Sequence, residues 1–177
     1  MASDRSNTSP WSLWFLLALL VGLIPGAASA VPMQNDPNGF EGIPWGASFS
    51  ESESFAKVED AGRLTTFELK SGTPTLGPAK VDSMRFMTIE GQFARVTVRY
   101  RGKEIHDQIL GYLQGKYGPL DRTPGQIASG VVKFLSWQGF NSEITLRYDT
   151  RTDQGIIFFE SQSLRSKLTE GNSATVF

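Results

Sequence analysis

The sequence contains no cysteine and only one histidine, His106. The missing thiols exclude disulfides and a cysteine nucleophile, and one histidine alone cannot build the usual zinc or copper sites. Any serine–histidine mechanism would need His106, which follows Ile105 on a predicted helix and is expected on the side or solvent face of that helix. We therefore predict no catalytic residues, no metal and no cofactor.

The sequence also has almost no excess of charge, with 17 Lys and Arg against 18 Asp and Glu. A chain this neutral lacks the basic field of a nucleic-acid-binding protein, so nucleic acid is excluded as an expected partner. Hydrophobic residues make up 40% of the chain, which excludes a disordered protein. The 18 glycines and nine prolines indicate many turns rather than a helical bundle.

The one long apolar run, LWFLLALLVGLI, extends from Leu13 to Ile24 and is followed by a small-residue motif ending at Ala30. An apolar stretch of about 7–15 residues before such a motif is typical of a secretory signal peptide. A membrane-spanning helix needs about 20 apolar residues. We expect cleavage after Ala30, no membrane span in the mature chain, and a periplasmic or secreted bacterial protein. An uncleaved anchor is the alternative.

The remaining chain predicts one domain. We assign 1–30 to the signal peptide Met1 to Ala30, 31–41 to a flexible lead-in and 42–177 to a single α+β domain. Two acidic loops, 35–39 and 149–155, contain possible calcium ligands. Arg151 lies between the two carboxylates of the second loop, however, so we interpret the loops as part of the lead-in and as a hairpin turn.

Periodicity predicts the elements of this domain. Ser48 with Glu51 forms a capping box that predicts a first helix. A second helix is expected over 103–117, where apolar residues recur at helical spacing before Gly118-Pro119, and a short third helix over 163–170. Six strands are expected, over 64–70, 81–89, 93–101, 131–137, 143–149 and 155–161. The predicted fold class is an α+β two-layer sandwich: an antiparallel sheet of about six strands with two or three helices on one face, arranged as two α-β-β-β units.

The segment GFEGIPWGASFSE, with YGP and SWQG further along, resembles a group of uncharacterised bacterial secreted proteins in which a G-I-x-W-G-x-[ST] element opens the first helix. The layout also resembles, more loosely, α/β modules of the beta-lactamase-inhibitor type and of small outer-membrane assembly lipoproteins. Those modules bind proteins, so the resemblance implies an interaction role. The chain departs from the lipoproteins because it has no cysteine for lipid attachment.

The face of the sheet away from the helices is the candidate binding surface. If Tyr148 pairs with Ile156, the outward side chains include two large aromatics, Trp137 and Phe159, and three arginines, Arg95, Arg99 and Arg147. Aromatic residues and arginine are enriched in protein-binding hot spots. The hypothesis is that the aromatics anchor a partner and the arginines contact its acidic groups. The alternative is that the third helix, the lead-in or a second copy simply covers this face.

The sequence therefore favours an exported, non-catalytic binding module, with a periplasmic or envelope protein or a small ligand as its partner. The alternative is a cell-envelope hydrolase with an unrecognised acidic active site, since Asp and Glu are plentiful and their spacing singles out no pair.

Overall fold

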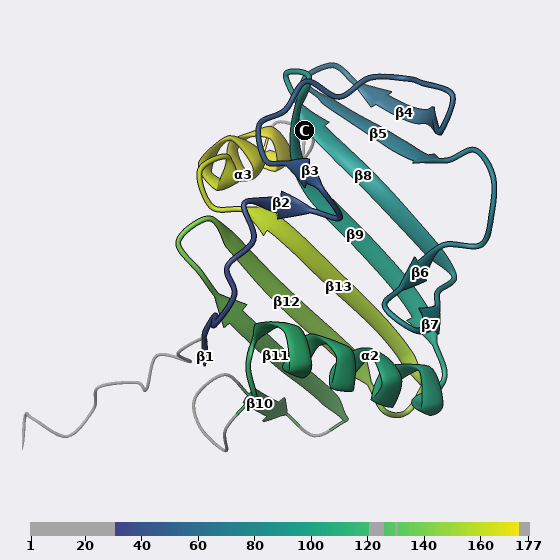
Figure 1. Ribbon diagram of the computed structural model, residues 1–177, viewed down its shortest axis with the longest axis vertical. Coiled ribbons are helices and arrows are strands. Elements are labelled where there is room, and N and C mark those ends of the chain that lie inside the picture. The colour runs from purple at the N-terminus through teal and green to yellow at the C-terminus, as the bar shows by residue number, and fades with distance from the viewer. Residues whose placement is uncertain (1–30, 121–125, 130, 174–177) are drawn as a thin grey trace, which may run out of the picture.

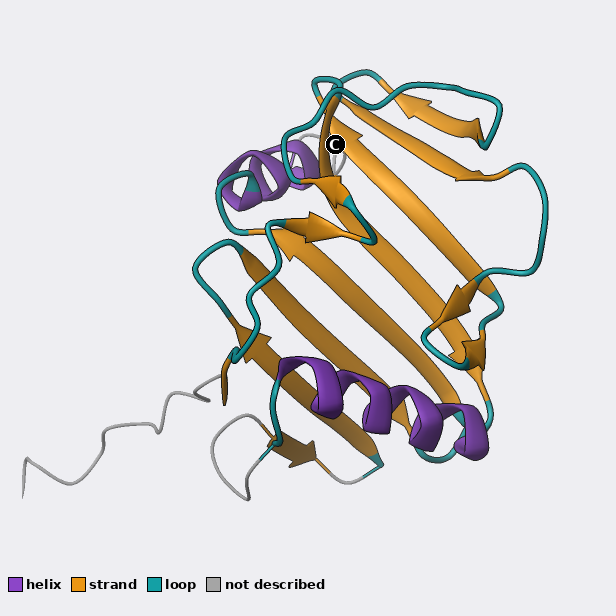
Figure 2. Ribbon diagram, in the orientation of Figure 1, coloured by secondary structure: helices purple, strands orange, loops and turns teal. Residues whose placement is uncertain are grey.

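The computed structural model describes residues 31–120, 126–129 and 131–173, so the expected signal peptide lies outside the described residues. The fold is mostly β (Figures 1 and 2), which corrects the predicted α+β two-layer sandwich. Its main sheet has nine strands rather than about six. The helices lie on opposite faces of that sheet, and no pair of α-β-β-β units is formed.

The main sheet contains all six predicted strands and three more. Eight strands lie in the order β1 (Val31–Pro32), β11 (Val132–Gln138), β12 (Ser142–Asp149), β13 (Gln154–Ser161), β9 (Gln92–Arg101), β8 (Ser83–Ile89), β5 (Leu64–Leu69) and β4 (Phe55–Ala61), and β10 (Gln126–Ser129) also pairs with β11. All neighbours are antiparallel except β1 and β11.

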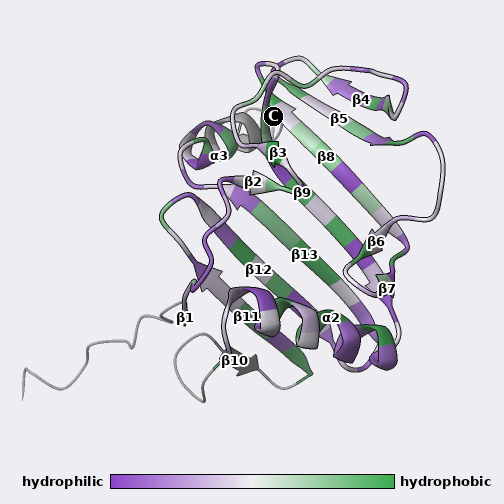
Figure 3. Cartoon of the chain, in the orientation of Figure 1, coloured by the Kyte–Doolittle hydropathy of each residue, from purple (hydrophilic) through white to green (hydrophobic). Residues whose placement is uncertain are grey.

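One face of the sheet, the core face, is covered by α2 (Lys103–Tyr117) and by two small hairpins. The hairpins are β2 (Gly39–Phe40) with β3 (Ile43–Pro44), and β6 (Thr75–Leu76) with β7 (Ala79–Lys80). Hydrophobic residues recur along the central strands β12 and β13 (Figure 3), and those on the core face are buried.

On the opposite face, the outer face, α3 (Arg165–Ser173) and the turn before it cover one end. There Leu164 and Leu168 pack against Ile89 and Ala94 in a second, smaller core. In the described part of the chain, α3 does not extend over the rest of the outer face.

The first predicted helix does not form, although its capping box is present. The backbone of this segment pairs instead with the start of β9: Gly46 N–H donates to the Phe93 carbonyl at 2.8 Å, and Phe93 N–H donates to the Ala47 carbonyl at 2.8 Å. The Phe49 ring stacks on the Phe93 ring, with 5.3 Å between centroids. Backbone pairing with β9 satisfies the hydrogen-bonding groups of this segment, and aromatic packing partly buries its apolar side chains. The local capping box therefore does not lead to a helix.

The segment expected as a lead-in carries β1 and β2 and is tied to the sheet. Val31 pairs with Trp137 in the parallel β1–β11 bridge. The Asp36 carboxylate accepts hydrogen bonds from the backbone N–H of Asn141 at 2.6 Å and of Ser142 at 3.0 Å. Asp36 therefore fixes the β11–β12 turn.

One edge of the sheet is β4. Its register with β5 shifts between Lys57 and Glu59, and three of its seven side chains are charged. A bulge and charges on an edge strand disfavour pairing with another chain. The edge is therefore a poor surface for strand addition.

Candidate functional site

The structure separates the five predicted site residues into two groups. Arg95, Arg99 and Arg147 lie on the outer face, as predicted from the alternation in β9 and β12. Trp137 and Phe159 lie on the core face and are 0% and 2% exposed, so their predicted outward placement is wrong.

Trp137 pairs with Ile144, which is buried on the core face, so the orientation of β11 was misjudged by itself. For Phe159 the error is one residue of register in the last hairpin. Tyr148 pairs with Gly155, whereas the prediction paired it with Ile156. A slip of one residue turns every side chain of a strand to the other face. Phe159 therefore points into the core, and Ile156 and Phe158 take the outward positions.

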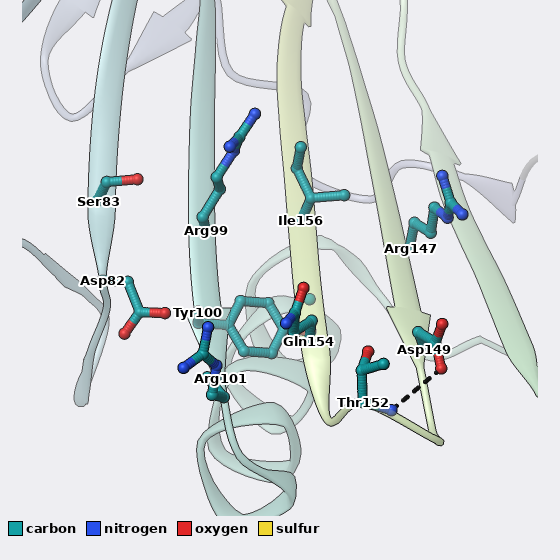
Figure 4. A pocket seen from close by; sticks show the side chains of 11 residues that line it. Asp82, Ser83, Arg99, Tyr100, Arg101, Arg147, Asp149, Thr152, Gln154 and Ile156 are labelled. Carbon is teal, nitrogen blue, oxygen red and sulfur yellow. Dashed lines mark hydrogen bonds between the residues drawn. The ribbon is translucent and has the colours of Figure 1, made fainter.

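The outer face is organised in rows that cross the strands. One row consists of Ser83, Arg99, Ile156, Arg147 and Phe134, on β8, β9, β13, β12 and β11, and we call it the arginine row. Each member pairs directly with the next, so both arginines flank one isoleucine (Figure 4). Neighbouring strands lie about 4.8 Å apart, which places the two arginine backbones about 10 Å apart.

The two arginines of this row form no ion pair within the part of the chain that the structure describes. The Arg147 guanidinium lies 5.7 Å from the centre of the Phe134 ring, a cation–π contact that leaves its N–H groups accessible. Phe134 is itself 37% exposed. Arg99 and Arg147 are therefore exposed positive charges that form no ion pair among the described residues, although the charge of Arg147 acts on nearby Asp149.

Arg95, the third predicted arginine, is different. Its guanidinium is 2.6 Å from the Glu160 carboxylate, and both side chains are mostly buried. It also lies 5.6 Å from the centre of the Phe158 ring. Its charge is already satisfied, so we assign Arg95 a structural role.

A hollow of about 410 Å³ lies along the arginine row, next to the β12–β13 turn (Figure 4). Arg99, Arg147 and Ile156 line it, together with Arg101 and two carboxylates, Asp82 and Asp149.

The Asp149 carboxylate is hydrogen-bonded to the turn that it stabilises. Its carboxylate accepts hydrogen bonds from the backbone N–H of Arg151 at 2.8 Å and of Thr152 at 3.2 Å. These bonds hold the pKa of the Asp149 carboxyl below its usual range. Asp149 therefore stays charged but directs its Oδ1 at the backbone, in keeping with its interpretation as part of a hairpin turn.

The chemistry of the hollow is that of anion binding. His106 lies on the core side of the sheet and therefore cannot act as a base for Ser83. Among the described residues, no group of three or more His, Asp or Glu side chains is placed to hold a metal ion. Guanidinium groups with an apolar surface between them suit a carboxylate or phosphate attached to an apolar body.

His106 is buried, which corrects its predicted place on the side or solvent face of the helix. It is 3% exposed, and the buried stripe of α2 runs through His106, Ile109, Leu113 and Tyr117. Its Nδ1 lies 2.7 Å from the Tyr100 hydroxyl. Its ring stacks on the Tyr148 ring, with 3.8 Å between centroids. The histidine thus joins α2 to the sheet.

Stability is expected to fall as the pH drops below about 6.5, the ordinary pKa of histidine. Burial lowers the pKa of His106, and the nearby Lys133 and Lys103 act in the same direction, against Asp107. Between this lowered pKa and 6.5 the unfolded chain binds more protons than the native one, so the free energy of unfolding decreases with falling pH. Urea unfolding between pH 8 and pH 5 measures this slope.

His106→Gln is the matched variant for this measurement. It should flatten the slope between pH 6.5 and the pH at which the ring resonance of His106 titrates in the native protein. An unchanged slope in the variant would contradict the assignment, as would a native-state pKa of His106 above 6.5.

Neither helix in the described ranges combines the length and the apolar character needed to cross a bilayer. The chain matches no family model, and no curated protein or solved structure shows significant similarity to it.

Proposed function

We propose that this protein is an exported, non-catalytic binding module of the bacterial cell envelope, and that the arginine row binds an acidic surface of a partner protein. The observation that carries the proposal is the pair of exposed arginines, Arg99 and Arg147, which form no ion pair among the described residues and lie on either side of Ile156. The apolar run that ends before Ala30 supports the location.

Guanidinium chemistry supports an acidic partner. The planar fork of arginine matches a carboxylate through two parallel hydrogen bonds, and arginine is less strongly hydrated than lysine. Holding two such groups side by side on a β-sheet, with no ion pair to either among the described residues, costs repulsion that a bound acidic group would reduce. The row therefore favours negative charge in whatever covers it.

The width and apolar content of the row support a protein rather than a small anion. It crosses five strands, which corresponds to about 19 Å. Ile156 at its centre and the exposed Phe134 at its end add apolar contact beside the charges. Arginine combined with aromatic surface is typical of the centre of protein interfaces.

The double charge reversal Arg99→Glu with Arg147→Glu is expected to weaken partner binding about 100-fold, or about tenfold for each arginine. The partner is first captured in the envelope with a photo-crosslinking amino acid at Thr97, which lies on the outer face one row from the arginine row. The captured protein is identified and purified, and its dissociation constant is measured for each variant.

Lys80→Glu is the matched control, because Lys80 is exposed on β7 and belongs neither to the arginine row nor to the lining of the hollow beside it. It should leave the dissociation constant within twofold of the parent value. Reversing an acidic residue of the partner should restore binding to the doubly reversed variant. Failure to capture any protein, or equal losses in the control and the double variant, would refute the proposal.

A further inference from the structure

A second hollow of about 410 Å³ opens on the core face, separate from the arginine row. It lies between the β2–β3 hairpin, the β4–β5 edge, the β6–β7 hairpin and α2, and Met84 and Phe86 of β8 also line it. Its volume falls within the range of about 300–1,000 Å³ that is typical of small-molecule sites.

Aromatic rings from three separate elements form much of its wall. Phe40 of β2 and Phe55 of β4 both pack edge-on against Phe86, with centroids 6.2 Å and 4.9 Å apart. Phe86 is 4% exposed and Met84 is 6% exposed, so their positions are fixed by the core. Rings in this arrangement offer faces and edges to another ring, and methionine adds a polarisable contact.

The helix side of the pocket is equally fixed. Gly77, at a φ of 57°, lets the Tyr112 ring approach so closely that a Cβ there would lie 2.5 Å from it. The Tyr112 hydroxyl also accepts a hydrogen bond from Lys116 Nζ at 3.0 Å. A wall held in this way is formed before any ligand arrives, which lowers the entropic cost of binding.

The charge around the pocket selects its occupant. Among the described residues, Glu41 is the one acidic or basic side chain that lines the pocket, and its carboxylate lies 3.5 Å from Lys116 Nζ. An anionic ligand would meet no unpaired cation here, and it would lie beside this carboxylate. We propose that the pocket binds one neutral, ring-containing apolar small molecule.

Titration with N-phenyl-1-naphthylamine, a neutral aromatic fluorophore, tests this site in the folded chain. The expected result is a saturable, one-to-one rise in fluorescence. Leu69→Glu places a charge at the rim, where Leu69 is 37% exposed, and should raise the dissociation constant about tenfold. Thr75→Phe, at an exposed lining position, should obstruct the mouth and weaken binding by a similar factor.

Val58→Glu is the matched control, because Val58 is 47% exposed on β4 and does not line the pocket. Its dissociation constant should stay within twofold of the parent value. No saturable binding by the folded parent chain would overturn the inference. So would equal weakening by Val58→Glu and Leu69→Glu, or unchanged affinity in both Leu69→Glu and Thr75→Phe.

Discussion

Replacing Trp137 with alanine is expected to lower the free energy of unfolding by about 3–5 kcal/mol. The Trp137 side chain is 0% exposed and is the largest fully buried one among the described residues. Its indole N–H donates a hydrogen bond to the Gly118 carbonyl at 2.9 Å, which joins the end of α2 to β11. The substitution therefore leaves both a cavity and an unsatisfied carbonyl. Urea unfolding monitored by circular dichroism measures the loss.

Phe134→Ala, three residues earlier on β11, is the matched control. Phe134 lies on the outer face and is 37% exposed, so its removal should cost less than about 1 kcal/mol. Phe159→Ala should behave like Trp137→Ala, since Phe159 is 2% exposed and its ring packs 4.8 Å from that of Phe40. A small loss for Trp137→Ala and a large one for Phe134→Ala would mean that the faces of β11 are the reverse of those described.

Trp137→Ala and Phe159→Ala also distinguish two interpretations of these aromatic residues, as outward anchors for a partner or as core residues. As outward anchors, Trp137 and Phe159 would leave the fold intact when removed and abolish binding. If they are core residues, their removal lowers the free energy of unfolding before it affects binding. The burial of both side chains supports the second outcome.

The strands could be predicted from the sequence because their signal is local. Alternating apolar and polar side chains identify β9, and the turn at Glu90–Gln92 gives the register of β8 correctly, with Met87 opposite Arg95. The same reasoning placed α2, whose bounds match the prediction at 103–117. Where a short turn follows a clear pattern, sequence alone gives both the element and its partner.

The features that the sequence did not predict depend on contacts between residues that are far apart in the chain. The register of β12 with β13 is set within the turn at 150–153, where Asp149 accepts two backbone hydrogen bonds and Asp153 adopts a φ of 53°. His106 occupies a buried position of α2 because Tyr100 and Tyr148 surround it, and neither neighbour is local to the helix stripe. Polar side chains in a core need such specific partners, which periodicity does not reveal.

The candidate site was likewise predicted in part, from local alternation but without the contacts between strands. Alternation placed Arg95, Arg99 and Arg147 on one face, but which of them is free depends on the register between β9 and β13. That register sets Arg95 opposite Glu160 and Arg99 opposite Ile156. The sequence therefore predicted the composition of the surface and not the pair of arginines that remain available for binding.

Gly155→Ala is expected to lower the free energy of unfolding by about 3 kcal/mol, from overpacking and from disrupted buried hydrogen bonding together. A Cβ at Gly155 would lie 1.9 Å from Cζ of Tyr100, so the tyrosine ring must move. That movement pulls its hydroxyl away from His106, to which it now lies at 2.7 Å. Because His106 is the only histidine, its ring resonance reports the change directly by NMR.

Gly115→Ala provides the opposite control. A Cβ there meets no heavy atom within 4 Å, and alanine is favoured over glycine inside a helix by about 1 kcal/mol, so this variant should be more stable than the parent. In Gly155→Ala the pKa of His106 should rise toward its ordinary value as the ring loses its enclosure, while in Gly115→Ala it should stay lowered. If Gly155→Ala keeps both the parent stability and an unshifted His106 resonance, the Tyr100 ring does not lie over Gly155, and the histidine is not held between the two tyrosines.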